Sequence, residues 1–130
     1  MKNNRALIEK TIIQARKRWA YDEQWKIEWK FSDRGRESGG GYCDFEPYAE
    51  KNIRVELNPD YEFISNLRRV KLDIYHELGH PIISPVWRAA TDWADHLIPE
   101  KGKMRAVFEE SINSAENLVI DPIVTQVFKI

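Results

Sequence analysis

The spacing of apolar and polar positions predicts one helix and three strands in the first half of the chain. Residues 4–20 repeat apolar side chains every three or four positions, which predicts an amphipathic helix. Residues 25–31 and 52–57 alternate strictly between apolar and polar side chains, as half-buried strands do. Residues 42–46 form a shorter third candidate strand. Residues 32–41, which lie between the candidate strands 25–31 and 42–46, are polar and end in glycines. This stretch predicts a flexible hairpin connection.

The second half of the chain is predicted to be helical. A helix capped by Ser65 or Asn66 carries a helical apolar stripe at Leu67, Val70, Ile74 and Leu78. Pro81 directly follows His80, and a residue before proline disfavours helical geometry, so this helix is expected to bend or end at His80.

Two further helical segments are expected before the end of the chain. A short helix is predicted from Val86 to Leu97, and a last helix from about Met104 to Ile120, stopped by Asp121-Pro122. The apolar tail from Ile123 to Ile130 either lies over a cleft or packs on the core, and the second arrangement is favoured.

Together these elements predict an α+β fold. A chain of 130 residues is long enough for one core, so we expect a single domain over residues 1–130. The connections between the strands are short, which favours a mostly antiparallel three-stranded sheet between the first helix and the later helices.

Charge and cysteine content exclude several classes of protein. The net charge of −1 gives no overall field for nucleic acid or an anionic membrane, and no apolar run approaches twenty residues. Glu9, Lys10 and Gln14 interrupt the first apolar residues, so no signal peptide is predicted. Cys43 is the single cysteine, which excludes an intrachain disulfide, suits a reducing compartment and predicts a cytoplasmic protein.

The chemistry of the chain is concentrated in one motif on the second helix. His76 and His80 stand four positions apart, with Glu77 beside the first histidine. Positions i and i+4 share one face of a helix, so two imidazoles there can bind one zinc ion. Glu77 is then placed to take a proton from water at the metal, which predicts metal-assisted hydrolysis.

A catalytic zinc site of this kind needs a third protein ligand. With Phe108 at zero on a helical wheel, Glu116 falls at about 80° and Glu109 at about 100°, both beside the apolar stripe of the last helix. Glu116 is the preferred ligand and Glu109 its nearest competitor. Other candidates lie in the intervening segment: Asp92, Asp95 and His96.

Asp73 stands one turn before the first histidine. It is expected either to hydrogen-bond a ligand imidazole or to be a solvated surface acid.

The two segments His76-Glu77-Leu78-Gly79-His80 and Ala115-Glu116-Asn117-Leu118-Val119 carry a family resemblance. With the order of elements, they make the chain similar to zincin metallopeptidases of the gluzincin type, close to the minimal minigluzincins and to metallopeptidases of phage and prophage genomes. The resemblance implies a zinc-dependent peptidase with metal ligands His76, His80 and Glu116 and Glu77 as general base.

The resemblance also implies how a peptide or protein substrate is held. In zincins the strand before the motif helix usually binds the substrate as an added strand, which implies a cleft rim at residues 52–57. A further group is wanted to stabilise the oxyanion, and His96, Tyr61 and Tyr75 are the candidates.

Two other functions compete with the peptidase. One is a non-enzymatic phage or mobile-element interaction protein on a zincin-like fold, with a structural or decayed metal site. The presence of Glu77 favours the enzyme, because a structural zinc site needs no base. The other is a nucleic-acid-binding protein, which the near-neutral charge does not favour.

Overall fold

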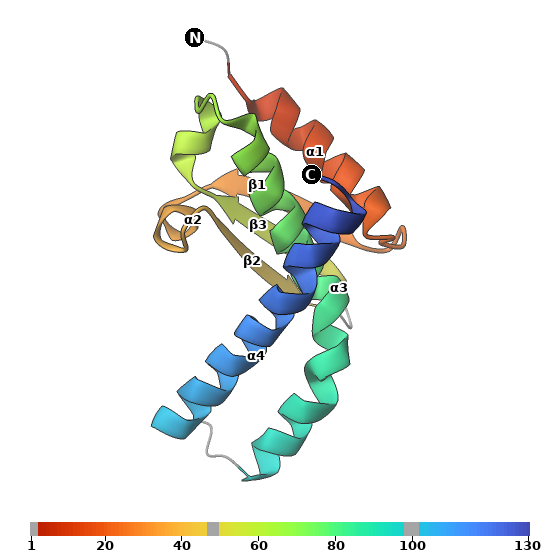
Figure 1. The fold of residues 1–130 in the computed structure, drawn as a ribbon, viewed down its shortest axis with the longest axis vertical. Helices are drawn as coiled ribbons and strands as arrows, with labels where there is room; N and C mark the ends of the chain where they lie inside the picture. The colour runs from red at the N-terminus through yellow and green to blue at the C-terminus, as the bar shows by residue number, and fades with distance from the viewer. Residues whose placement is uncertain (1–2, 47–49, 98–101) are drawn as a thin grey trace.

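The computed structural model describes residues 3–46, 50–97 and 102–130, with side chains described throughout except at residues 85–97. These residues form an α+β fold, as predicted (Figure 1). In chain order the elements are α1 (Arg5–Arg18), β1 (Lys26–Phe31), α2 (Asp33–Glu37), β2 (Gly41–Glu46), β3 (Asn52–Leu57), a 3-10 turn (Pro59–Glu62), α3 (Leu67–Leu97), α4 (Lys103–Pro122) and a π-helical turn, η2 (Ile123–Val127).

The three strands form a mixed sheet in the order β1-β3-β2. β2 and β3 are antiparallel, but β1 runs parallel to β3, so the prediction of a mostly antiparallel sheet is wrong for one of the two strand pairs. The central strand is β3, and β2 forms one edge of the sheet.

The short helix α2 explains this topology and replaces the predicted hairpin connection. The Ser32 hydroxyl accepts a hydrogen bond from the Gly35 N–H at 3.1 Å and caps the helix. A Cβ at Gly35 would lie 2.4 Å from the carbonyl carbon of Leu57, so only glycine lets α2 pack on the end of β3. The chain therefore crosses the end of β3 and returns as β2 on its other side.

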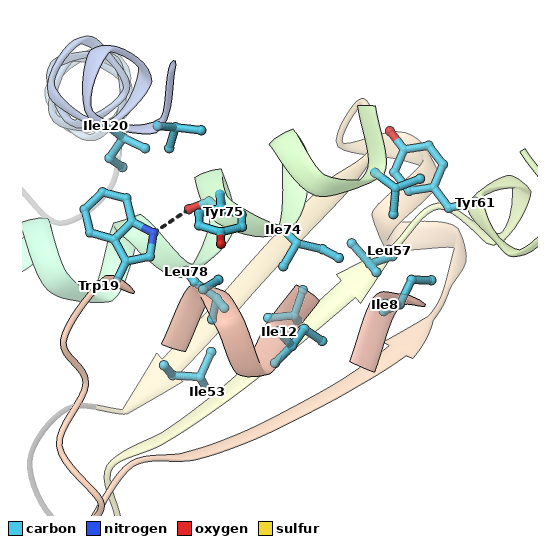
Figure 2. Packing of buried hydrophobic residues seen from close by; sticks show 14 residues of the cluster. Ile8, Ile12, Trp19, Ile53, Leu57, Tyr61, Ile74, Tyr75, Leu78 and Ile120 are labelled. Carbon is cyan, nitrogen blue, oxygen red and sulfur yellow. Dashed lines mark hydrogen bonds between the residues drawn. The ribbon is translucent and has the colours of Figure 1, made fainter. Parts of the chain in front are cut away.

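The core lies between one face of the sheet and the helices α1 and α3. Figure 2 shows Ile8 and Ile12 of α1 meeting Ile53 of β3 and Ile74 and Leu78 of α3, all at most 7% exposed. The helical apolar spacing in α1 and in the motif helix, and the alternation in β3, therefore reflect burial on this core.

The helix α3 runs through the predicted break at His80. Pro81 lies inside it and is fully buried, so packing holds the helical path although proline removes one helical hydrogen bond. The predicted separate helix from Val86 to Leu97 is part of the same helix. The far halves of α3 and α4 project beyond the sheet (Figure 1).

The predicted stop of the last helix at Asp121-Pro122 is also wrong. The helix α4 includes Pro122 and continues into η2. In η2 Val124 is 2% exposed, and Phe128 beyond it packs edge-on against Trp19 with ring centroids 4.9 Å apart. The tail packs on the core, the arrangement that the sequence favours.

Candidate metal and catalytic site

The two motif histidines lie next to the buried stripe of α3 and face each other. Their Nε2 atoms are 3.2 Å apart, and the rings meet edge to face. Two nitrogen ligands of a tetrahedral zinc, each about 2.0–2.1 Å from the metal, are about 3.3 Å apart. The donor types and the separation of His76 and His80 therefore fit a shared zinc ion.

Glu116 comes to this pair from α4. It is 6% exposed, its Oε2 lies 3.4 Å from Nδ1 of His80, and Ser84 donates a hydrogen bond to its Oε1. Because that Nδ1 is not the nitrogen that faces His76, the carboxylate stands beside the pair rather than between the two rings. Among the described residues no three His, Cys, Asp or Glu side chains form a closed metal-binding group.

Asp121 contacts the other side of the first histidine. Its Oδ1 lies 2.9 Å from Nδ1 of His76, so the nitrogen facing the cavity is Nε2. The sequence interpretation missed this contact because it took Asp121 as the end of the helix. The sequence does contain a signal for this contact. A ligating histidine normally hydrogen-bonds a carboxylate through its second nitrogen, and Asp121 follows the candidate ligand Glu116 within two helical turns.

Asp73 does not contact either histidine ring through a hydrogen bond. It accepts one from the hydroxyl of Tyr61, so the expected hydrogen bond to a ligand imidazole is not formed. Arg69 donates to the same hydroxyl at 3.3 Å and to the carbonyl of Gly39 at 3.3 Å. This network fixes the turn that leads into β2.

Glu77 lies under the start of the edge strand. A Cβ at Gly41 would lie 2.9 Å from its Cγ, so the backbone of β2 approaches the carboxylate closely. Burial raises the pKa of Glu77 above its usual range, Asp73 adds to the rise, and His76 and His80 oppose it. A buried carboxylate with a raised pKa in a cavity is typical of a general base.

A cavity of about 400 Å³ connects these side chains. Its floor is α3, one wall is β2 and the opposite wall is α4. Among the described side chains, the cavity is lined by Ser38, Gly41, Tyr42, Cys43, Phe45, His76, Glu77, His80, Ser84, Asn113, Glu116 and Asn117. Cys43 is half-buried, and burial raises the pKa of its thiol.

The strand at the cavity is not the predicted one. Asn52–Leu57 is the central strand β3, and both of its edges are paired, so it has no free edge for an added strand. β2 lines the cavity instead and pairs only on its β3 side within the described part of the chain. The order of strands in the sheet, which the alternation pattern does not contain, decides this.

Several predicted candidates lie away from the cavity. Glu109 is exposed and pairs with Arg105 at 3.1 Å. Tyr61 and Tyr75 do not line the cavity, and neither does the tail after α4. The side chains of the remaining candidates, Asp92, Asp95 and His96, are outside the described ones.

Comparisons with protein-family models, with curated proteins and with solved structures found no match to this chain. In the described segments, no helix has both the length and the apolar character that crossing a membrane requires.

Proposed function

We propose that this chain is a zinc-dependent peptidase of the gluzincin type. The observation that carries the proposal is the cavity in which the Nε2 atoms of His76 and His80 face each other at 3.2 Å, with Glu77 beside them under an edge strand. In the proposal, His76, His80 and Glu116 hold the metal and Glu77 is the general base.

The third ligand is assigned to Glu116 on burial and contact. A carboxylate that is 6% exposed needs a partner, and Glu116 has only Ser84 and the near side of the His80 ring within the described residues. Glu109, the competitor, is solvated and paired with Arg105. The two Nε2 atoms already face a common point, so rotation of the Glu116 side chain is the movement needed to direct its carboxylate toward the same ion.

A zinc ion held by these residues would supply a Lewis acid and would make water a better nucleophile near neutral pH. Glu77 takes one proton as the water oxygen bonds to the peptide carbonyl carbon. It returns that proton to the amide nitrogen as the C–N bond breaks, so the products are an acid and an amine. The raised pKa of Glu77 suits both transfers, because it brings the carboxyl nearer to working pH.

The strand β2, which forms the cavity wall opposite α4, indicates the class of substrate. The outer edge of β2 offers backbone N–H and C=O groups along one side of the cavity. An extended peptide can add to this edge as a further strand, with its side chains alternating toward and away from the floor. The substrate is therefore a peptide or an unfolded protein segment in extended form.

Elemental analysis tests the metal site directly. Wild type, Glu116→Ala and Glu109→Ala are purified without a histidine tag or chelator, and zinc is counted per chain. We expect one zinc in wild type and in Glu109→Ala, and a strong loss in Glu116→Ala. Zinc lost only in Glu109→Ala would assign the third ligand to Glu109 instead of Glu116. No zinc in wild type or either variant, even after reconstitution, would exclude the peptidase and favour the non-enzymatic interaction protein.

Hydrolysis of fluorescein-labelled casein tests the reaction. Zinc-loaded wild type should cleave it, and Glu77→Gln should retain zinc but lose about 100-fold or more of the rate, the usual contribution of a general base. A Glu77→Gln variant as active as wild type would exclude the proposed mechanism.

A further inference from the structure

The α4 wall of the cavity contains an acceptor without a donor. Asn117 lines the cavity beside Glu116, and its carboxamide oxygen is buried with no hydrogen-bond partner in the described structure. Burial of a polar atom without a partner costs stability, so native proteins keep few of them. Because Asn117 lines the cavity, a small rotation of its carboxamide would let a ligand there supply the missing donor.

The neighbouring polar residues of α4 show that position 117 is distinct. Asn113 lies one turn before Asn117 and also lines the cavity, but it is exposed. Ser114, the next residue along, is exposed and does not line the cavity. Of the two asparagines, only Asn117 has a buried carboxamide atom without a partner. Water can therefore satisfy the amide of Asn113 in the free protein, whereas the buried oxygen of Asn117 is left without a donor.

An extended peptide added to β2 would supply the missing donor. Successive residues of a strand direct their N–H and C=O groups to opposite edges, so half of them face away from β2. These groups would face the α4 wall, where Asn117 lies. A carboxamide has one acceptor and two donor hydrogens, so it can accept from the N–H and donate to the C=O of one such residue.

We propose that Asn117 binds the main chain of the substrate from the side opposite to β2. The peptide is then held at both edges, by the strand on one side and by a side-chain amide on the other. Because the contact is made to backbone atoms, it selects an extended peptide with a free N–H at the substrate residue that Asn117 contacts. It does not select a particular side chain. This inference rests on the proposed peptidase function, and it adds Asn117 to the residues that bind the substrate.

Binding of fluorescein-labelled β-casein, a protein without a compact fold, measures this contact. Glu77→Gln serves as the background so that the probe stays intact, and Asn117→Ala, Asn113→Ala and Ser114→Ala are added to it in turn. We expect the dissociation constant, measured by fluorescence anisotropy, to rise about tenfold with Asn117→Ala, the loss of one or two hydrogen bonds. Ser114→Ala, outside the cavity lining, should change it less than about twofold. An equal rise with Asn113→Ala would overturn the specific role of Asn117.

A urea unfolding series separates binding from a structural role. Asn113→Ala is the matched control, because it makes the same exchange on the same helix and so changes helix propensity equally. Since the Asn117 oxygen has no partner among the described residues, Asn117→Ala should be at least as stable as Asn113→Ala. A clear loss of stability in Asn117→Ala alone would show that the side chain supports the fold, and would overturn the proposal.

The outcomes distinguish this proposal from the one on which it rests. Equal casein affinity with and without Asn117→Ala would overturn the role of Asn117 and leave the peptidase function standing. No casein binding by Glu77→Gln, together with no cleavage by zinc-loaded wild type, would overturn both.

Discussion

At the scale of single residues, the burial of Glu77 sets a test that needs no substrate. Its pKa is raised in the folded protein above the ordinary value of 4.5, chiefly by burial. The folded state then holds the proton more tightly than the unfolded state, so stability falls as pH rises from the ordinary pKa through the raised one. Above both values the ionised carboxylate is a constant cost to folding.

Glu77→Gln removes that cost. In the presence of a chelator, the variant should be more stable than wild type at neutral pH, and the difference should shrink as pH falls toward 4.5. Urea denaturation of both proteins across this range measures the effect. Glu28→Gln, on the exposed outer face of β1, is the matched control. Equal stabilities of wild type and Glu77→Gln at every pH would contradict the buried position of Glu77.

Asp121 is the second residue whose effect can be isolated. Its contact with Nδ1 of His76 orients the ring, and loss of such a partner typically weakens metal binding 10- to 100-fold. Asp121→Ala should therefore weaken zinc affinity by about that factor, measured by competition with a chelating dye. Because Asp121 is 66% exposed, its effect on folding should be small. The exposed acid Glu110 on the same helix supplies the control, Glu110→Ala, and an equal loss in both variants would exclude a specific role.

At the scale of elements, the motif helix is held closely by its neighbours at Gly79. A Cβ there would lie 2.8 Å from the ring of Trp19 and 2.9 Å from Cγ2 of Ile120. Helix propensity alone favours alanine over glycine by about 1 kcal/mol. Overpacking of a tight contact costs about 1–3 kcal/mol, and here both neighbours are buried, so the overpacking term prevails.

Gly79→Ala should therefore lower the free energy of unfolding by up to about 2 kcal/mol, measured by urea denaturation. Ser111→Ala, at an exposed position on α4, shows the effect of alanine without crowding. A stabilised Gly79→Ala would mean that α1 and α4 do not approach the motif helix as closely as described.

Periodicity predicted the elements well where one face of an element is buried. The strand Asn52–Leu57 and the helix through Val70 and Ile74 follow their patterns because those side chains meet the core. The helix ends at Pro81 and Pro122 were wrong because local proline rules were outweighed by packing: Pro81 is fully buried, and α4 continues into a tail anchored on the core.

At the scale of the whole molecule, the sequence predicted the motif histidines but not the elements that surround them. The pair His76 and His80 is defined by local helical geometry, so spacing alone predicts that they face each other. The strand at the cavity depends on sheet order, which is set by the crossing of α2 over the end of β3. The contact of Asp121 depends on how α4 packs against α3, and no local pattern contains that information.

The last residues, from η2 onward, pack on the core and lie away from the cavity. The ring of Phe128 packs edge-on against Trp19, with centroids 4.9 Å apart, and at a tilt against Tyr75, with centroids 5.8 Å apart. No residue of η2 lines the cavity. Phe128→Ala should therefore cost about 2–3 kcal/mol of unfolding free energy, because the ring is only partly buried, and should leave zinc affinity unchanged. Val127→Ala, at a position 65% exposed, should change stability by less than about 0.5 kcal/mol.

A tail that covered the cavity would behave in the opposite way. Removing its aromatic anchor would then raise the rate of casein hydrolysis at temperatures where the variant is fully folded. We expect no such rise, because η2 stands behind His76 on the Asp121 side, where a second, smaller cavity is lined by Asp121, Val124 and Thr125. Thermal unfolding and casein hydrolysis on the same Phe128→Ala preparation decide between a tail that anchors α4 and a tail that inhibits the site.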